Sequence, residues 1–215
     1  MNNLIVLPMV IPLITGVILV FFRSNIIFQR FLTVFSLIVN TILSLYLLDY
    51  VQKEGILSLD FGGWVPPFGI LFVADSFAML LVTTTFIISI VCVLFAMSTI
   101  GMKREKLYFY TFVLLLIAGV NGSFLTGDIF NLFVTFEVML LSSYVLITLG
   151  GTKSQLKESL KYITINVISS SLFLIAIALL YGLVGTLNMA HIATRVAEVE
   201  QTPLLTVVSL LFLIV

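Results

Sequence analysis

Segments of about 20 apolar residues recur along the whole of this chain, and each is long enough to cross the roughly 30 Å hydrocarbon core of a bilayer as a helix. Such segments restrict the fold, because every backbone N–H and C=O group in lipid has to be hydrogen-bonded within the protein. Of the 215 residues, 61% are hydrophobic and 9% are charged, whereas soluble domains are about half apolar and a quarter charged. The sequence therefore predicts an all-α, polytopic membrane protein.

The positions of the apolar runs predict six full transmembrane helices and the start of a seventh. We expect these helices at residues 4–22, 31–48, 76–97, 107–125, 129–149, 162–184 and from 203 onward. The seventh run ends at Val215 after about 20 Å of helix, which is shorter than a membrane span. We therefore expect that the sequence is part of a longer protein.

Basic residues are distributed unevenly between the connections. The first, third and fifth connections hold eight of the ten, while Lys53 and Arg195 are the only two on the other side. The eight are Arg23, Arg30, Lys103, Arg104, Lys106, Lys153, Lys157 and Lys161. Because short loops rich in Lys and Arg stay in the cytoplasm, we expect these connections inside and the N-terminus outside.

The longest connections, residues 49–69 and 186–202, both lie on the predicted outer side. The first contains "LDFGGWVPPFGI", in which the glycines together with Pro66 and Pro67 favour turns, and Trp64 suits a membrane interface. We expect a short turn or hairpin that covers this outer face, and a binding site is the alternative.

A carboxylic acid, Glu137, lies near the middle of the fifth apolar run, "GDIFNLFVTFEVMLLSSYVLI". A charge at the bilayer midplane costs at least about 2.5–3.5 kcal/mol. Burial and a neighbouring cation have opposite effects on the pKa of such an acid, so its protonation can respond to a neighbour. The position predicts a proton-relay or ion-coupling site. The alternative is a neutral Glu that only joins helices by hydrogen bonds.

Two polar stripes run along this helix if successive residues are 100° apart. One stripe contains Glu137, Tyr144 and Thr148, and the other contains Asn131 and Thr135. We therefore expect other helices to surround this one. Glu137 would face protein or enclosed water, and Tyr144 and Thr148 would continue the proton path towards the cytoplasm.

The sequence offers no obvious cation at the depth of Glu137 in the first six helices. The nearest are Lys157 and Lys161 in "KESLKYITINVISSS", where Lys161 opens the sixth predicted helix. That helix continues with Asn166 and the serines at 169–171, which could carry water. We expect Lys161 to couple to Glu137. The alternative is a lysine of the positive-inside loop that extends to the interface.

The sequence gives little support for nucleotide binding, metal binding or nucleophilic catalysis. There is no Gly-rich phosphate loop with Lys, no cluster of metal ligands and no nucleophile with an adjacent base. The single cysteine, Cys92, lies within an apolar run. Asp75 and Asp128 each open a helix and are expected to act as caps, with ion recruitment as the alternative. We expect no cofactor, no bound metal, no nucleic-acid partner and no soluble-type catalysis.

Several stretches resemble the antiporter-like membrane subunits of Mrp-type multisubunit sodium/proton antiporters and of respiratory complex I. The resemblance rests on "LPMVIPLITGVIL", "GGWVPPFGI", "FVADSFAMLL", "GDIFNLFVTFEVMLLSSYVLI" and "LKYITINVISSSLFLIAIALLYGLVGTLNM", and it covers essentially all 215 residues. Within the family, the start and the "GDIFNLFVTFEVMLLSSY" stretch are most similar to the D subunits of Mrp antiporters.

The resemblance implies a fold of about fourteen helices with inverted repeats and a broken seventh helix. Residues 1–106 would form three outer helices with the turn region 49–69, and residues 107–215 would begin the first repeat. Glu137 would be the fifth-helix glutamate of a proton path, paired with a lysine of the seventh helix beyond Val215. The implied function is proton translocation coupled to Na⁺ exchange, by a transporter subunit in a bacterial cell membrane whose partners are the other subunits of its complex.

Two other functions remain possible at this point. The same helices serve proton-pumping membrane subunits of complex I-like enzymes, which reduce quinone. A scaffold subunit, in which Glu137 only holds helices together, is the other alternative.

Overall fold

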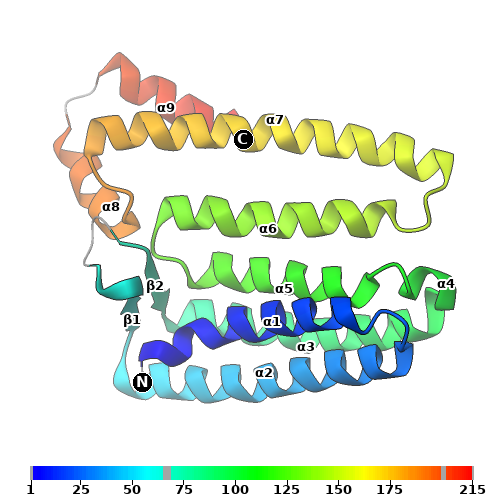
Figure 1. Cartoon of the computed structure of the whole chain (residues 1–215). Helices are drawn as coiled ribbons and strands as arrows, with labels where there is room; N and C mark the ends of the chain where they lie inside the picture. Colours follow the sequence, from blue (N-terminus) through cyan, green and yellow to red (C-terminus); the bar gives the residue numbers. More distant parts are fainter. Residues whose placement is uncertain (1, 65–68, 200–201, 215) are drawn as a thin grey trace.

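The computed structural model describes residues 2–64, 69–199 and 202–214 as a set of long helices that run back and forth along one direction (Figure 1). The long helices are α1 (Leu7–Phe21), α2 (Ile26–Glu54), α3 (Ser76–Thr99), α5 (Phe109–Leu125), α6 (Ile129–Thr148), α7 (Lys153–Val184) and α9 (Pro203–Ile214). The short elements are η1 (Asn2–Val6), β1 (Leu57–Asp60), η2 (Phe61–Gly63), β2 (Leu71–Ala74), α4 (Met102–Glu105) and α8 (Met189–Glu198). The predicted all-α, polytopic fold class is confirmed.

Five helical stretches are long and apolar enough to cross a membrane, namely Asn3–Phe21, α2, α3, α6 and α7. Helix α5 is apolar but has only 17 residues, and α9 has 12. Among the described residues these five are the candidate spans by length and composition, and α5, at 17 residues, lies at the lower limit of a membrane span. Helix α5 nevertheless lies inside the bundle, because it packs against α1, α3 and α6.

Helices α2 and α7 are longer than the apolar runs that predicted them. Helix α7 begins at Lys153 because Thr152 and Gln155 form a reciprocal capping box at that point. Lys161, which was expected to open the helix, therefore lies well inside it. Helix α2 begins after Asn25, whose side chain accepts a hydrogen bond from the Phe28 N–H group at 3.1 Å. Polarity marks where a helix leaves the hydrocarbon, whereas caps decide where the helix ends.

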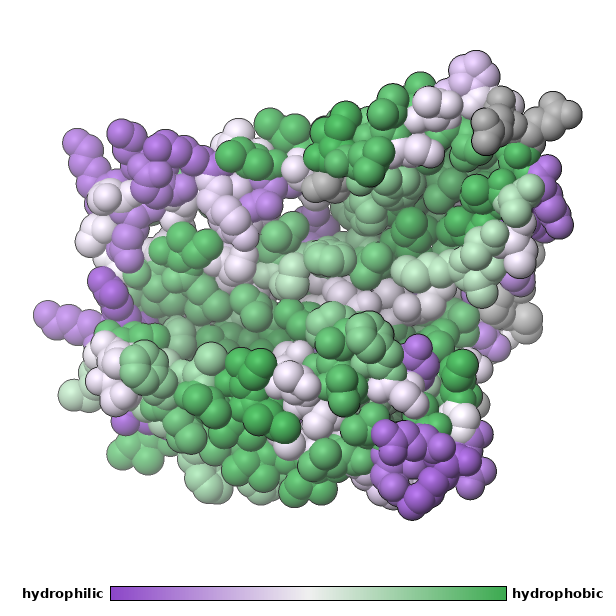
Figure 2. Space-filling model, turned by 180° about the vertical axis from the view of Figure 1, so that it is seen from behind, coloured by the Kyte–Doolittle hydropathy of each residue, from purple (hydrophilic) through white to green (hydrophobic). Residues whose placement is uncertain are grey.

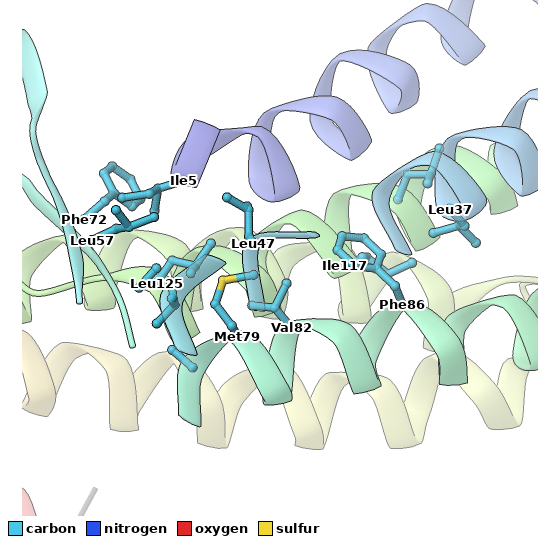
Figure 3. Packing of buried hydrophobic residues seen from close by; sticks show 14 of the residues in the cluster. Ile5, Leu37, Leu47, Leu57, Phe72, Met79, Val82, Phe86, Ile117 and Leu125 are labelled. Atoms are coloured by element: carbon cyan, nitrogen blue, oxygen red, sulfur yellow. The ribbon is translucent and has the colours of Figure 1, made fainter. Parts of the chain in front are cut away.

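The main hydrophobic core lies between α1, α2, α3 and α5 (Figure 3). Phe86 of α3, Ile117 of α5 and Leu37 of α2 belong to this core, and all three side chains are almost completely buried. Small residues bring α5 and α6 together: a Cβ added at Gly119 would lie 2.7 Å from the Met139 nitrogen and 2.8 Å from the Thr135 oxygen. The two backbones are thus in direct contact, as small residues allow between membrane helices.

The two longest connections contain short ordered elements. Strands β1 and β2 make an antiparallel hairpin in the register Leu57↔Ala74 to Asp60↔Leu71. A turn or hairpin was expected within residues 49–69, but α2 extends to Glu54 and the second strand lies at Leu71–Ala74. The predicted turn formers Pro66 and Pro67 lie outside the described residues. The second connection contains the ten-residue helix α8, which the sequence analysis did not predict. Asn188 caps it by accepting a hydrogen bond from the His191 N–H group at 3.1 Å.

The basic connections meet at the end of the bundle opposite the hairpin. Arg23 Nε donates to the Lys106 oxygen at 3.1 Å, which joins the first connection to the third. Figure 2 shows an apolar band between hydrophilic patches at the two ends of the molecule.

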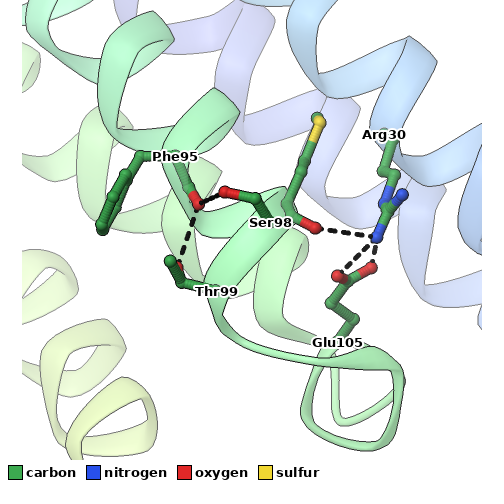
Figure 4. A network of polar contacts seen from close by, with 6 residues as sticks. Arg30, Phe95, Ser98, Thr99 and Glu105 are labelled. Carbon is green, nitrogen blue, oxygen red and sulfur yellow. Dashed lines mark hydrogen bonds and ion pairs between the residues drawn. The ribbon is translucent and has the colours of Figure 1, made fainter.

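Arg30 of α2 forms a bidentate ion pair with the fully buried Glu105 of α4 and donates to the Met97 oxygen at 3.2 Å (Figure 4). This pair fastens the third connection to α2.

Candidate functional site

Helix α6 carries the candidate site, and its start is fixed by Asp128. The Asp128 side chain accepts a hydrogen bond from the Asn131 N–H group at 2.7 Å, which confirms its expected role as a helix cap. Burial raises the pKa of the Asp128 carboxyl, and hydrogen bonds from backbone N–H groups oppose that rise. Asp75 caps α3 in the same way, through the Ala78 N–H group at 2.7 Å.

One polar stripe of α6 faces α5, as the two-stripe pattern predicted. Thr135 and Ser123 of α5 share a hydrogen bond of 3.1 Å between their hydroxyl oxygens. Asn131 donates to the Thr126 hydroxyl at 2.9 Å. These groups lie beside the close backbone contact at Gly119, so the side of α6 away from Glu137 is rigidly packed.

Glu137 lies on the other side of α6, next to α7. It lines a cavity of about 290 Å³ between the two helices and is partly buried. The lining residues are Phe133, Phe136, Glu137, Met139, Leu140, Asn166, Ser169, Ser170 and Phe173. Within the described residues, the Glu137 carboxylate is in none of the ion pairs and in none of the side-chain hydrogen bonds. The acid therefore faces a partly open cavity and has no direct protein partner in the described part of the chain.

Helix α7 supplies the polar groups of this cavity from a single face. Asn166, Ser169 and Ser170 are three and four residues apart, so they lie one above another on the helix. Asn166 Nδ2 donates to the Tyr162 oxygen at 2.9 Å, which leaves its Oδ1 as an acceptor. The cavity therefore combines a carboxylic acid, an amide oxygen and two hydroxyls, a set that can hold water molecules and pass protons between them.

Phenylalanines close part of the cavity, and sequence analysis did not identify them as site residues. The rings of Phe133 and Phe173 lie 6.3 Å apart across α6 and α7, and Phe173 stands edge-on to Phe212 of α9 at 5.6 Å. Phe133 lies four residues before Glu137, so helical spacing alone could have placed it beside the acid. No spacing rule could have placed Phe173 there.

Tyr144 and Thr148 continue the Glu137 stripe, but they lie outside the cavity lining. Tyr144 is buried, and its ring stands edge-on to Tyr162 of α7 at 5.6 Å. The Thr148 hydroxyl donates within its own helix, with the Tyr144 and Val145 oxygens at 3.0 and 2.9 Å. Tyr144 thus lies at the α6–α7 interface, whereas Thr148 is engaged with its own backbone.

Lys161 does not line the cavity that contains Glu137. It forms an ion pair with Glu158 at 2.9 Å, and both side chains are more than 60% exposed. At 100° per residue Lys161 lies about 140° round α7 from Asn166, so it faces away from the cavity. The Lys161–Glu158 pair is thus an exposed surface ion pair, of a kind that contributes little to stability. Its expected coupling to Glu137 stays a prediction.

No metal centre is visible in the part of the chain that the structure describes. Within residues 2–64, 69–199 and 202–214, no group of three or more His, Cys, Asp or Glu side chains lies close enough together to bind a metal ion. Among the described residues, Glu137 is the only carboxylate that lines its cavity.

Long apolar helices, two of which border a cavity lined by one acid, define a polytopic membrane protein. Comparison with known proteins identifies which kind. Residues 126–215 match the family model described as NADH:quinone oxidoreductase/Mrp antiporter, TM. The chain is 51% identical, over 215 residues, to the D subunit of the Na(+)/H(+) antiporter of Alkalihalophilus pseudofirmus, and the match covers 100% of this chain and 44% of that protein.

Solved structures agree with the sequence comparison. A chain of the Mrp complex from Dietzia sp. DQ12-45-1b matches with a TM-score of 0.86 at 30% identity, over 98% of this chain and 39% of that one. A chain of the membrane-bound sulfane sulfur reductase, an archaeal respiratory membrane complex, matches with a TM-score of 0.81 at 30% identity, over 93% of this chain and 41% of that one. The chain belongs to the family of antiporter-like membrane subunits. It spans less than half the length of these relatives.

Proposed function

We propose that the chain is part of a proton-translocating subunit of a multisubunit Na⁺/H⁺ antiporter, and that Glu137 carries the proton within it. The observation that carries this proposal is the position of Glu137 in a largely apolar cavity between α6 and α7, opposite the polar side chains of Asn166, Ser169 and Ser170. An acid in a membrane interior that has no fixed partner is free to exchange a proton with water. The likeness to the D subunit of a Na(+)/H(+) antiporter supports the coupling to Na⁺.

In the proposed mechanism, water in the cavity delivers a proton to Glu137. The Asn166 amide oxygen and the hydroxyls of Ser169 and Ser170 orient that water, because they lie on the one face of α7 that borders the cavity. Tyr144 and Thr148 extend the same stripe of α6 towards the basic end of the bundle. A proton leaving Glu137 in that direction would reach the cytoplasm.

The protonation of Glu137 would be controlled by the charge of a neighbouring cation. A cation that approaches Glu137 stabilises the carboxylate and promotes proton release, and its departure promotes protonation. From the resemblance, we expect that cation to be a lysine of the seventh helix beyond Val215. Lys161 is the second candidate, although its pair with Glu158 would first have to break.

The location proposed for the protein is a bacterial cell membrane, with the N-terminus outside. Five membrane-length helices and the antiporter relatives support a membrane location. The orientation rests on the basic connections, which gather at one end of the bundle. Its partners would be the other subunits of an Mrp-type complex, the lipid bilayer, protons and Na⁺.

The experiment that tests this function is Na⁺-dependent collapse of a pH gradient in everted vesicles that contain the complete complex. We expect Glu137→Gln to lower the initial exchange rate by more than about tenfold, because a relay acid typically contributes at least that much. Glu198→Gln in α8 is a matched control with the same chemical change on an exposed side chain outside the spans. Assembly of both variants is checked on a native gel.

Equal exchange rates in the wild type and an assembled Glu137→Gln variant would contradict the proposed role of Glu137. They would favour the scaffold alternative, in which the neutral amide still holds the helices together. That alternative also predicts that Glu137→Leu reduces assembly, since it removes every hydrogen bond at this position.

A redox-driven pump is the second candidate function. It is favoured by the likeness to a chain of an archaeal respiratory membrane complex and by the family description, which names NADH:quinone oxidoreductase as well as Mrp antiporters. A wild-type complex that ignores Na⁺ but acidifies vesicles when quinone is reduced would support this candidate and exclude the antiporter.

A further inference from the structure

The turn between α1 and α2 meets the loop between α4 and α5, and Arg23 is held where they meet. Its Nε donates to the Lys106 oxygen at 3.1 Å, and its Nη1 donates to the Tyr108 hydroxyl at 3.5 Å. The guanidinium carbon also lies 4.8 Å from the centre of the Tyr108 ring, within the range of a cation–π contact. The guanidinium is thus held by three contacts before any ligand arrives.

The tyrosine that holds Arg23 has a strained backbone. Tyr108 has φ 62°, and it is the single non-glycine residue with positive φ among the described residues. For an L-residue this conformation costs about 1–2 kcal/mol, and such strain is concentrated where a site needs a particular geometry. Here the strained turn places the aromatic ring against the guanidinium group.

A cavity of about 380 Å³ opens beside this arrangement. Phe21, Arg23, Ser24 and Lys106 line it. Within the described residues, neither Arg23 nor Lys106 takes part in an ion pair, and the neighbouring Glu105 is fully buried and bound by Arg30. The cavity therefore carries two positive charges and a hydroxyl, with no acid among its lining residues.

The cavity lies where an apolar helix leaves the membrane. Helix α1 ends at Phe21, whose side chain is 81% exposed, and Arg23 follows directly. A ligand in the cavity would contact cationic groups at one end and an exposed aromatic ring at the other. This amphipathic pattern matches a lipid better than a soluble anion.

We propose that this cavity binds the headgroup of an anionic phospholipid. The phosphodiester would accept hydrogen bonds from the free Arg23 Nη2 group, the Lys106 ammonium and the Ser24 hydroxyl, and the acyl chains would pass over Phe21. Arg and phosphate form strong charge-assisted bonds, and a pre-positioned guanidinium loses little entropy when it binds. A lipid held here would tie the first connection to the loop that begins α5, the helix against which α6 packs.

The test is lipid retention by the complete complex in detergent, measured by native mass spectrometry over a titration of phosphatidylglycerol or phosphatidylcholine. Detergent removes the diffuse attraction of a charged bilayer, so retained lipid reports a built site. The site variant is Arg23→Gln with Lys106→Gln. The control variant is Lys103→Gln with Lys153→Gln, which removes two exposed cations at the same end that do not line the cavity.

We expect the wild type to prefer phosphatidylglycerol over phosphatidylcholine. The site variant should bind phosphatidylglycerol about thirtyfold more weakly, the effect of two lost cationic contacts, and the control should stay within about threefold of the wild type. Equal binding by the site variant and the wild type, or an equal loss in the control, would overturn the proposal. Displacement of the lipid by millimolar inorganic phosphate would identify a free-anion site instead.

Arg23→Lys covers the case in which the double variant does not assemble. It keeps the charge but loses the planar group that donates to Lys106 and stacks on Tyr108. We expect a partial loss of phosphatidylglycerol binding, and an unchanged affinity would contradict the role of the fixed guanidinium. These experiments measure lipid binding alone, so their outcome does not depend on the proposed proton-transfer function.

Discussion

Replacing Gly119 by alanine should separate α5 from α6 and lower the stability of the protein. The added Cβ would lie 2.7 Å from the Met139 nitrogen, 2.8 Å from the Thr135 oxygen and 3.0 Å from the Met139 Cα. All three are backbone atoms, so no side chain can move aside. Since ordinary contact begins at 3.4 Å, the helices would have to part by about 0.7 Å. Overpacking of this kind costs about 1–3 kcal/mol.

Two other glycines provide a graded comparison within the same chain. A Cβ at Gly16 of α1 would meet the Thr111 oxygen at 3.3 Å, a milder clash. A Cβ at Gly182 of α7 would meet nothing within 4 Å, and alanine there should stabilise the helix by about 0.5–1 kcal/mol. The expected order of stability is therefore Gly182→Ala above wild type, then Gly16→Ala, then Gly119→Ala.

The assay is thermal unfolding of the complex in detergent, followed by intrinsic fluorescence. A cost of 1 kcal/mol corresponds to about 2–4 °C for a chain of this length, so Gly119→Ala should lower Tm by about 2–12 °C. Under the proposed function, the same variant should also reduce cation/proton exchange, because it moves the helix that carries Glu137. An unchanged Tm for Gly119→Ala would show that the close α5–α6 contact does not limit the packing, and the reasoning would fail.

Two further predictions concern the polar groups outside the cavity. Glu105→Gln leaves the Arg30 guanidinium without its ionic partner and should cost about 2–3 kcal/mol, less than for a fully buried pair because Arg30 is 34% exposed. Lys53→Gln breaks an exposed pair and should change Tm by less than about 2 °C, so equal effects of the two variants would refute this ranking. Asp128→Asn keeps the cap on Asn131 but removes a carboxyl whose pKa is raised by burial. Because a raised folded-state pKa adds stability that is lost as pH rises through it, the wild type should become more stable relative to this variant as pH falls towards the ordinary Asp pKa of 3.8, and a constant Tm difference would contradict this.

Several features of this protein could be predicted from local sequence because they depend on local physics. The length of each apolar run predicts a membrane helix, and an aspartate before such a run predicts a cap, as found at Asp75 and Asp128. The depth of Glu137 follows from its place within one run. Its stripe follows from the 3.6-residue period, and so does the opposite stripe that packs on α5.

The tertiary structure alone decided which groups meet. Arg30 and Glu105 are far apart in sequence, and no periodicity links them, yet they form the bidentate pair that fastens the third connection. The face of α7 that carries Asn166 borders Glu137, while the face that carries Lys161 turns away. Helix periodicity gives the residues that share a face. Only the packing of one helix on another gives the neighbour of that face, because this packing depends on contacts between distant segments, such as the backbone contact at Gly119.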